Sequence, residues 1–178
     1  MDVPTYPRLL FITDAAVNVA PDLEAKVDIV QNAIDLAHML NIADPKVAIL
    51  AAVETVNLKM QATLDAAALC KMADRGQITG ALLDGPLAFD NAISLVAART
   101  KGIKSAVAGQ ADILLVPDIE SGNMLAKQLE YLADALTSGI VLGARVPIVL
   151  TSRADSAETR TASTAVAMVM AHAKRKKV

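Results

Sequence analysis

Apolar residues along the chain gather in short continuous runs, which alternate with longer stretches where they recur every three or four positions. A short run bounded by proline, glycine or polar residues is typical of a buried strand, and the longer spacing is typical of an amphipathic helix. The pattern predicts strands at residues 8–13, 46–52, 78–83, 113–116, 139–142 and 146–150. It predicts helices at residues 22–40, 63–74, 91–100, 120–137 and 156–173.

The order of these elements determines the expected fold class. Strands and helices alternate, which predicts an α/β fold with a mostly parallel sheet flanked by helices and joined by right-handed crossovers. The carboxyl ends of parallel strands meet at one edge of such a sheet, where ligands bind. The helix at 156–173 is apolar along one side and no predicted element follows it, so we expect it to pack onto something other than this sheet.

Composition narrows the class of protein. The chain has 178 residues, the size of one domain or slightly more, and it is 54% hydrophobic but 2% aromatic with no Trp, so its core must be aliphatic. No apolar run approaches the roughly 18 residues that cross a membrane. The formal net charge of −2 argues against nucleic acid as a partner. The basic cluster at residues 174–177 is interpreted as a solvated tail rather than a nucleic-acid or membrane patch.

Disulfide and metal chemistry are not predicted. Cys70 is the one cysteine, which excludes an intramolecular disulfide and a multi-cysteine metal site, and its helical context places it in the core. His38 and His172 lie on predicted helices without a partner motif, so no metal is expected. The first residues are acidic and contain prolines, unlike a signal peptide, and a cytoplasmic location is the expectation.

The first polar segment after a predicted strand is residues 84–90, Asp-Gly-Pro-Leu-Ala-Phe-Asp. Asp-Gly-Pro predicts a turn, glycine lets the backbone approach a ligand, and Asp90 is suited to cap the next helix. The segment is either a substrate loop that places Gly85 and Pro86 against a ligand, or an ordinary turn with a helix cap.

A second segment, residues 118–123, places an acid, a serine, a glycine and an asparagine between a strand and a helix. Backbone N–H groups at a helix start attract phosphate or another anion, which predicts ligand contacts from Asp118, Gly122 and Asn123. The alternative is that Ser121 or Glu120 only caps the helix. The segment has neither a Walker sequence nor G-x-G-x-x-G, so those nucleotide-binding loops are not predicted.

A third segment, residues 151–156, is Thr-Ser-Arg-Ala-Asp-Ser. The planar fork of Arg153 suits phosphate and can polarise an acyl oxygen. Ser152 can hydrogen-bond a thiol or thiolate, and Asp155 is a base or a helix cap. The alternative is helix capping plus a surface arginine. Ser152 lacks the G-x-S-x-G surroundings of a hydrolase nucleophile.

These three segments, in this order, resemble the phosphate acetyl/butyryl transferase family. The similar stretches are residues 84–94, 111–125 and 142–156, together with a loop at residues 13–18, Thr-Asp-Ala-Ala-Val-Asn. The resemblance extends from about Arg8 into the last helix. The sequence of residues 151–156 is more similar to the butyryl-type branch, and to acetyltransferase regions fused to enoyl-CoA hydratases, than to the large acetyltransferases.

The resemblance implies reversible transfer of a short-chain acyl group between CoA and inorganic phosphate, with acyl-CoA and phosphate as substrates, no covalently bound cofactor and no metal. It implies an isocitrate/isopropylmalate-dehydrogenase-like fold of two domains and a homodimer. Asp14 and Asn18 then join the substrate-binding residues. Ser152 would stabilise the CoA thiolate and Arg153 would hold the phosphate or acyl oxygen. An aspartate that serves as base in many relatives has no match at residues 157–160, which leaves Asp155 or Glu158 for that role.

Family members are considerably longer than this sequence. The resemblance therefore implies that residues 1–147 are the second, α/β domain of a phosphate acyltransferase, and that residues 148–178 are a strand and helix that return to a first domain. We expect residues 150–178 to be exposed or exchanged between subunits, because their usual packing surface is missing. Two functions stay open: the C-terminal portion of a phosphate acyltransferase, or a non-catalytic dimerisation or acyl-CoA-sensing module.

Overall fold

The computed structural model describes residues 1–176; Lys177 and Val178, the end of the predicted segment 148–178, lie outside the described residues. The strands are β1 Phe11–Thr13, β2 Lys46–Leu50, β3 Leu82–Leu87, β4 Ile113–Leu115, β5 Ile140–Val141 and β6 Ile148–Val149. The helices are α1 Leu23–Met39, α2 Gln61–Asp74, α3 Phe89–Ile93, α4 Leu95–Thr100, α5 Ile119–Leu132 and α6 Ala157–Lys176. None of the described helices is both long enough and apolar enough to span a membrane.

The main sheet has four strands in the order β1-β4-β2-β3, and every neighbouring pair is parallel. This confirms the predicted α/β class with a mostly parallel sheet. Strands β5 and β6 form a separate antiparallel pair. Because β4 lies beside β1, the carboxyl ends of the first and fourth strands are neighbours, although the paired residues Thr13 and Leu115 are 102 positions apart in the sequence.

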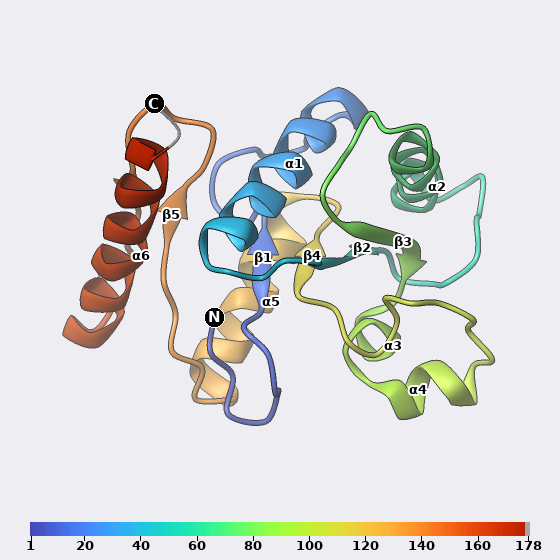
Figure 1. Ribbon diagram of the computed structural model, residues 1–178. Helices are drawn as coiled ribbons and strands as arrows, with labels where there is room; N and C mark the ends of the chain where they lie inside the picture. The colour runs from blue at the N-terminus through green and yellow to red at the C-terminus, as the bar shows by residue number, and fades with distance from the viewer. Residues whose placement is uncertain (177–178) are drawn as a thin grey trace.

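The two faces of the sheet carry different core clusters, because successive side chains of a strand point to opposite faces. In β2, Val47 and Ile49 pack with buried residues of α1 and α2, whereas Ala48 and Leu50 pack with Leu87 and with the helices of the other face. Figure 1 shows α1 and α2 on one side of the sheet and α3 and α4 on the other. Strands buried on both faces explain why the chain is rich in aliphatic residues.

The prediction for the third strand is wrong in position. The strand was expected at residues 78–83 with a turn at Asp-Gly-Pro, whereas β3 runs through Gly85 and Pro86 to Leu87. Proline is tolerated because β3 is an edge strand of the sheet. The register shifts here: Ala48 pairs with Asp84 but Leu50 pairs with Leu87, so β3 carries one extra residue as a bulge.

The helix predicted at residues 91–100 is two short helices, α3 and α4, which meet at Ser94. The Ser94 side chain accepts a hydrogen bond from the Ala97 N–H and caps α4. Asp90 lies inside α3, where its Oδ1 accepts from the neighbouring Asn91 N–H, and the N-cap position belongs to Ala88. The prediction that Asp90 caps the helix is therefore wrong: Ala88 is the N-cap of α3, and Ser94 is the N-cap of α4.

Helix α6 packs on its own chain, against β5, β6 and α1. The Gly139 N–H donates to Ser163 Oγ at 3.0 Å, and Lys174 Nζ donates to Ala144 O at 2.7 Å. Thr159, Ser163 and Met170 are buried on this face, whereas the other residues of 150–175 are exposed or half-buried, and exchange of the segment between subunits stays a prediction. The other face is open, and Met168 on it is 68% exposed.

Candidate functional site

The predicted site residues of two segments meet where β1 and β4 end. Thr13 pairs with Leu115, and the Val116 N–H donates to Thr13 O at 2.8 Å. The loop of residues 14–18, here called the Asp14 loop, therefore lies beside the start of α5. The amide of Asn123 donates to Ala15 O at 3.3 Å, which ties the first turns of α5 to the Asp14 loop.

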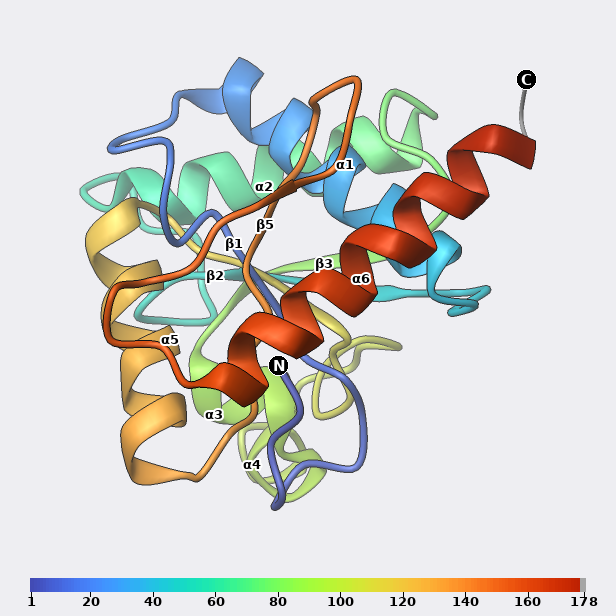
Figure 2. The same cartoon turned by 90° about the vertical axis from the view of Figure 1, so that its left-hand side faces the viewer.

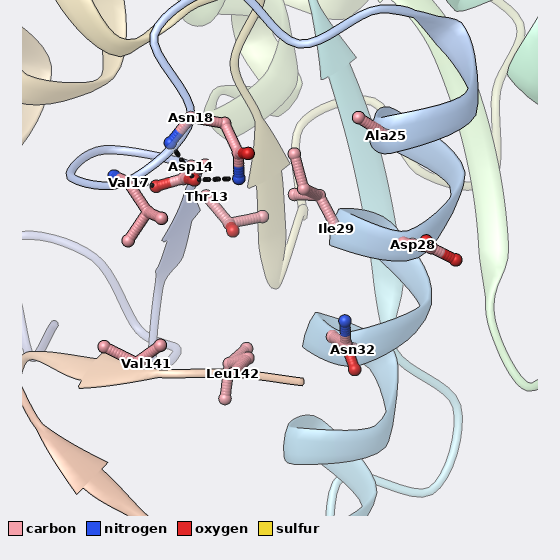
Figure 3. A pocket seen from close by; sticks show the side chains of 10 residues that line it. All are labelled: Thr13, Asp14, Val17, Asn18, Ala25, Asp28, Ile29, Asn32, Val141 and Leu142. Carbon is pink, nitrogen blue, oxygen red and sulfur yellow. Dashed lines mark hydrogen bonds between the residues drawn. The ribbon is translucent and has the colours of Figure 1, made fainter. Parts of the chain in front are cut away.

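Asp14 organises its own loop. Its Oδ1 accepts from the N–H groups of Ala16 and Val17 at 2.9 and 3.0 Å, and its Oδ2 accepts from the backbone and side-chain N–H groups of Asn18 at 2.8 and 2.7 Å. Partial burial by itself would raise the pKa of Asp14, but these hydrogen bonds together outweigh it and the pKa lies below its ordinary value. The carboxylate that was predicted to bind substrate is thus engaged with the loop (Figure 3).

Asp118 plays the same part at the start of α5. It is the N-cap: its Oδ1 accepts from the Ser121 N–H at 2.8 Å and from the Ser121 hydroxyl at 2.6 Å. These two bonds, with a smaller contribution from the Lys26 ammonium, hold the pKa of Asp118 below its usual range. The chain's own carboxylate thus caps this helix start, and the cap is Asp118 rather than Ser121 or Glu120, the two residues that the capping alternative named.

Gly122 allows the close approach between α5 and the Asp14 loop. A Cβ at this position would lie 2.7 Å from Val116 Cγ2 and 2.8 Å from Asp14 O, closer than real Cβ contacts. The glycine is buried in the first turns of α5. Its role in the structure is to let the helix backbone touch the loop, and direct contact with a ligand stays a prediction.

A hollow of about 210 Å³ lies between the Asp14 loop, α1 and β5. Its apolar lining residues are Val17, Ala25, Ile29, Val141 and Leu142, and its polar lining residues include Asp14, Asn18, Asp28 and Asn32 (Figure 3). Two carboxylates and no cation line it, so it suits a neutral part of a ligand better than a phosphate group. Sequence reasoning missed Asp28 and Asn32, although their i, i+4 spacing places both on one face of α1.

The third predicted segment, residues 151–156, is here called the Arg153 turn. Ser152 and Arg153 are exposed. Asp155 Oδ2 accepts from the Ser152 N–H at 2.6 Å, and the Thr159 N–H donates to Ser156 Oγ at 3.0 Å. Ser156 thus caps α6, and Asp155 closes the turn that presents Ser152 and Arg153.

The Arg153 turn lies against α5. Lys127 Nζ is 3.8 Å from Asp155 Oδ1, and Lys127 follows Asn123 by one helical turn, so both lie on the same face of α5. Figure 2 shows the segment that leads into α6 passing beside α5. The structure therefore brings the Arg153 turn to the face of α5 that also bears Asn123, the residue that contacts the Asp14 loop.

Gly85 and Pro86 lie elsewhere. They belong to β3, and β4 and β2 separate β3 from β1, a distance of about 14 Å at the usual spacing of strands. A Cβ on Gly85 would lie 2.8 Å from both Cβ and O of Ile49, so this glycine lets β3 approach β2. Their predicted contact with substrate has no support in the hollow beside the Asp14 loop.

Residues 1–176 contain neither a cluster suited to a metal ion nor a reactive thiol. No group of three or more His, Cys, Asp or Glu side chains in this part of the chain is placed to hold a metal ion. Burial, with the negative charges of Asp84 and Asp74 adding to it, raises the pKa of the Cys70 thiol to about 12. Such a thiol stays protonated at neutral pH and is a poor nucleophile.

The sequence of this chain is similar to those of known proteins. Residues 1–168 match the family model described as phosphate acetyl/butaryl transferase. The chain is 66% identical over 175 residues to a phosphate acetyltransferase of Rhizobium meliloti, covering 98% of the chain and 55% of the relative. It is 53% identical over 166 residues to a phosphate butyryltransferase of Clostridium acetobutylicum, covering 93% of the chain and 55% of the relative.

A solved structure gives the same picture. The branched-chain phosphotransacylase from Enterococcus faecalis V583 superposes with a TM-score of 0.80 at 39% sequence identity, covering 89% of this chain and 57% of that one. The chain spans about half the length of the curated relatives it matches. Both the family model and the sequence identities extend through all three predicted segments, and the chain therefore belongs to the phosphate acetyl/butaryl transferase family.

Proposed function

We propose that this chain is the C-terminal portion of a phosphate acyltransferase that moves a short-chain acyl group between CoA and inorganic phosphate. The observation that supports the proposal is the contact of the Arg153 turn with Lys127 of α5, on the helix face that also bears Asn123, in a chain of this family. Both substrates are anions. The exposed guanidinium of Arg153 matches them in charge and in geometry.

The reaction assigns a part to each residue of the turn. A phosphate oxygen attacks the thioester carbonyl, the carbon–sulfur bond breaks, and CoA leaves as a thiolate. In this proposal the Arg153 guanidinium donates to the phosphate or to the developing oxyanion, and the Ser152 hydroxyl donates to the sulfur. The reverse reaction needs a base for the CoA thiol. Both oxygens of Asp155 already face Ser152 and Lys127, which leaves Glu158, exposed in the first turn of α6, for that role.

The proposal extends to the domain arrangement, the assembly and the location. Residues 148–178 would return to a first domain, which is consistent with the exposed apolar side chains of β6 and of the outer face of α6. We further propose a homodimer that works in the cytoplasm, with no metal and no bound cofactor. Relatives with acetyltransferase and butyryltransferase names both match this chain, so the proposed acyl group is a short chain without a stated length.

A non-catalytic dimerisation or acyl-CoA-sensing module is the second candidate. It is favoured by the negative lining of the hollow and by the engagement of Asp14 and Asp118 with their own backbone, which leave Arg153 as the main group for an anion. Such a module would bind CoA without turning it over.

Thiol release from acetyl-, propionyl- and butyryl-CoA with inorganic phosphate tests the proposal, alongside CoA binding by calorimetry. The variant Arg153→Ala should lower turnover at least ~100-fold, as removal of one preorganised charge donor does. Arg99→Ala, at an exposed arginine of α4, is the matched control and should keep the wild-type rate. An unchanged rate in Arg153→Ala would reject the role of Arg153, and CoA binding without turnover in the wild-type chain would favour the sensing module.

A further inference from the structure

We propose that Lys127 is a positioning residue, which holds Asp155 against α5 and so keeps Ser152 and Arg153 beside Asn123. The inference rests on the proposed function for its effect on turnover, but its structural part stands separately. No segment singled out in the sequence contains Lys127.

The Arg153 turn is closed by Asp155. Besides the bond from the Ser152 N–H, the Asp155 N–H donates to Ser152 O at 3.2 Å, and the Ala154 N–H donates to Ser152 Oγ at 3.4 Å. The Asp155 side chain is only 8% exposed, although the residues around it are on the surface. A carboxylate buried this far needs a partner, because removing a charge from water is unfavourable unless it is paired and hydrogen-bonded.

Lys127 supplies the partner from a fixed direction. Its ammonium is 2.7 Å from Glu130 Oε2 and lies 5.5 Å from the centre of the Tyr131 ring. Both groups are on α5, three and four residues further on, so they hold the lysine on its own helix. The hydrogen bond that Lys127 donates to Glu130, followed by the charges of Glu130 and Asp155, raises the pKa of Lys127, which therefore stays charged throughout the neutral range. The contact to Asp155 is thus a link between α5 and the Arg153 turn.

Loss of this contact would make Arg153 less available to a substrate. Among the described residues Arg153 makes no ion pair, so its guanidinium is available to a substrate. Without Lys127, the cation closest to Asp155 in the sequence is Arg153, two residues away in the same turn. Arg153 would then fold back onto Asp155, and the turn would lose its contact with α5. Weaker binding of phosphate is the expected consequence.

The structural part is tested by amide hydrogen exchange at Ser152, whose N–H is donated to Asp155. Lys127→Met should increase the exchange rate about fivefold, the effect expected for loss of an ion pair near the surface. Lys127→Arg should restore slow exchange, because it keeps a cation at the same place. The matched control is Lys71→Met, since Lys71 has the same i, i+3 pair at 2.7 Å with Asp74 and lies on α2. Exchange in Lys127→Met equal to that in Lys71→Met would overturn the inference.

A double-mutant cycle shows whether Lys127 acts through Asp155. Asp155→Asn keeps an oxygen for the Ser152 N–H but removes the charge that faces Lys127. If the two residues act together, the double variant exchanges no faster than either single variant; additive effects would contradict the link. In turnover, Lys127→Met should raise KM for phosphate with a smaller change in kcat, and Lys127→Arg should restore it. A wild-type chain that neither binds CoA nor turns it over would reject the proposed function, while the exchange data would still decide the inference.

Discussion

At the scale of single residues, the carboxylates around the candidate site are committed to backbone groups. Asp14, Asp118 and Asp155 each accept a main-chain N–H within three or four residues of themselves. The three loops therefore have defined shapes before any ligand binds, and preorganised loops orient catalytic groups at low entropic cost. The exposed side chains that these loops present, Asn123, Ser152 and Arg153, are the ones left to meet a substrate.

The role of Asp14 predicts a pH-dependent stability. Its pKa in the folded chain is below its ordinary value, whereas the unfolded chain should titrate near 3.9. Its contribution is therefore complete above the unfolded pKa and is lost as the pH falls through the lower, folded pKa. Asp14→Asn should reduce the free energy of unfolding by about 1 kcal/mol at pH 7, a value kept small because the loop is partly solvated.

Urea unfolding at pH 7 and at pH 3 measures this difference. The gap between the wild-type chain and Asp14→Asn should narrow at the lower pH, because the wild-type carboxylate is then becoming protonated. Asp28→Asn removes the other carboxylate that lines the hollow, from an exposed position on α1, and serves as the control. A gap that widens on acidification would show that Asp14 does not stabilise the loop as a carboxylate.

At the scale of elements, periodicity located the buried strands and the long helices to within a few residues. It failed at β3, because a proline and a glycine that normally mark a turn sit in an edge strand where a bulge accommodates them. It also could not see the ion pair of Lys26 on α1 with Asp65 on α2, at 2.6 Å. The two residues are 39 positions apart, and neither lies in a recognisable motif.

This ion pair predicts strong coupling between α1 and α2. The side chains of Lys26 and Asp65 are only 6% and 8% exposed, so Lys26→Met would leave a buried carboxylate without its cation. We expect a loss of about 3–5 kcal/mol in the free energy of unfolding. Urea denaturation followed by circular dichroism measures the loss.

Two further variants make the result specific. Adding Asp65→Leu to Lys26→Met should recover much of the stability, because an apolar pair removes the unpaired charge. Lys71→Met breaks an exposed pair on α2 and should leave the denaturation midpoint unchanged. A Lys26→Met chain as stable as the wild type would mean that Asp65 finds another partner or solvent.

At the scale of the whole molecule, the candidate site joins two separate sheets. The Asp14 loop and the start of α5 follow strands of the parallel sheet, whereas the Arg153 turn follows β6 of the small antiparallel sheet. The contact between Lys127 and Asp155 connects the two parts. The antiparallel pair and α6 also carry a group of exposed apolar side chains: Val146, Ile148, Val149, Leu150, Met168 and Val169.

Such a surface predicts association. Exposed apolar groups on β6, its flanks and α6 are typical of an interface, with another domain or with a second copy. The double variant Val146→Lys and Met168→Lys should therefore reduce self-association of this chain, measured by light scattering after gel filtration. Val96→Lys changes a residue that is 73% exposed on α4 and should leave the assembly as it is. Equal masses for all three proteins would show that this surface takes no part in self-association.

The sequence by itself determined the fold class, the extent of most elements and the three polar segments that carry the family resemblance, because these depend on local periodicity and on short motifs. Only the tertiary structure decided which segments meet. The order of strands places β1 beside β4, so the Asp14 loop touches α5, and it puts Gly85 and Pro86 at the opposite edge of the sheet. Likewise, only the docking of the Arg153 turn revealed Lys127, because a contact between side chains 28 residues apart leaves no periodic trace in the chain.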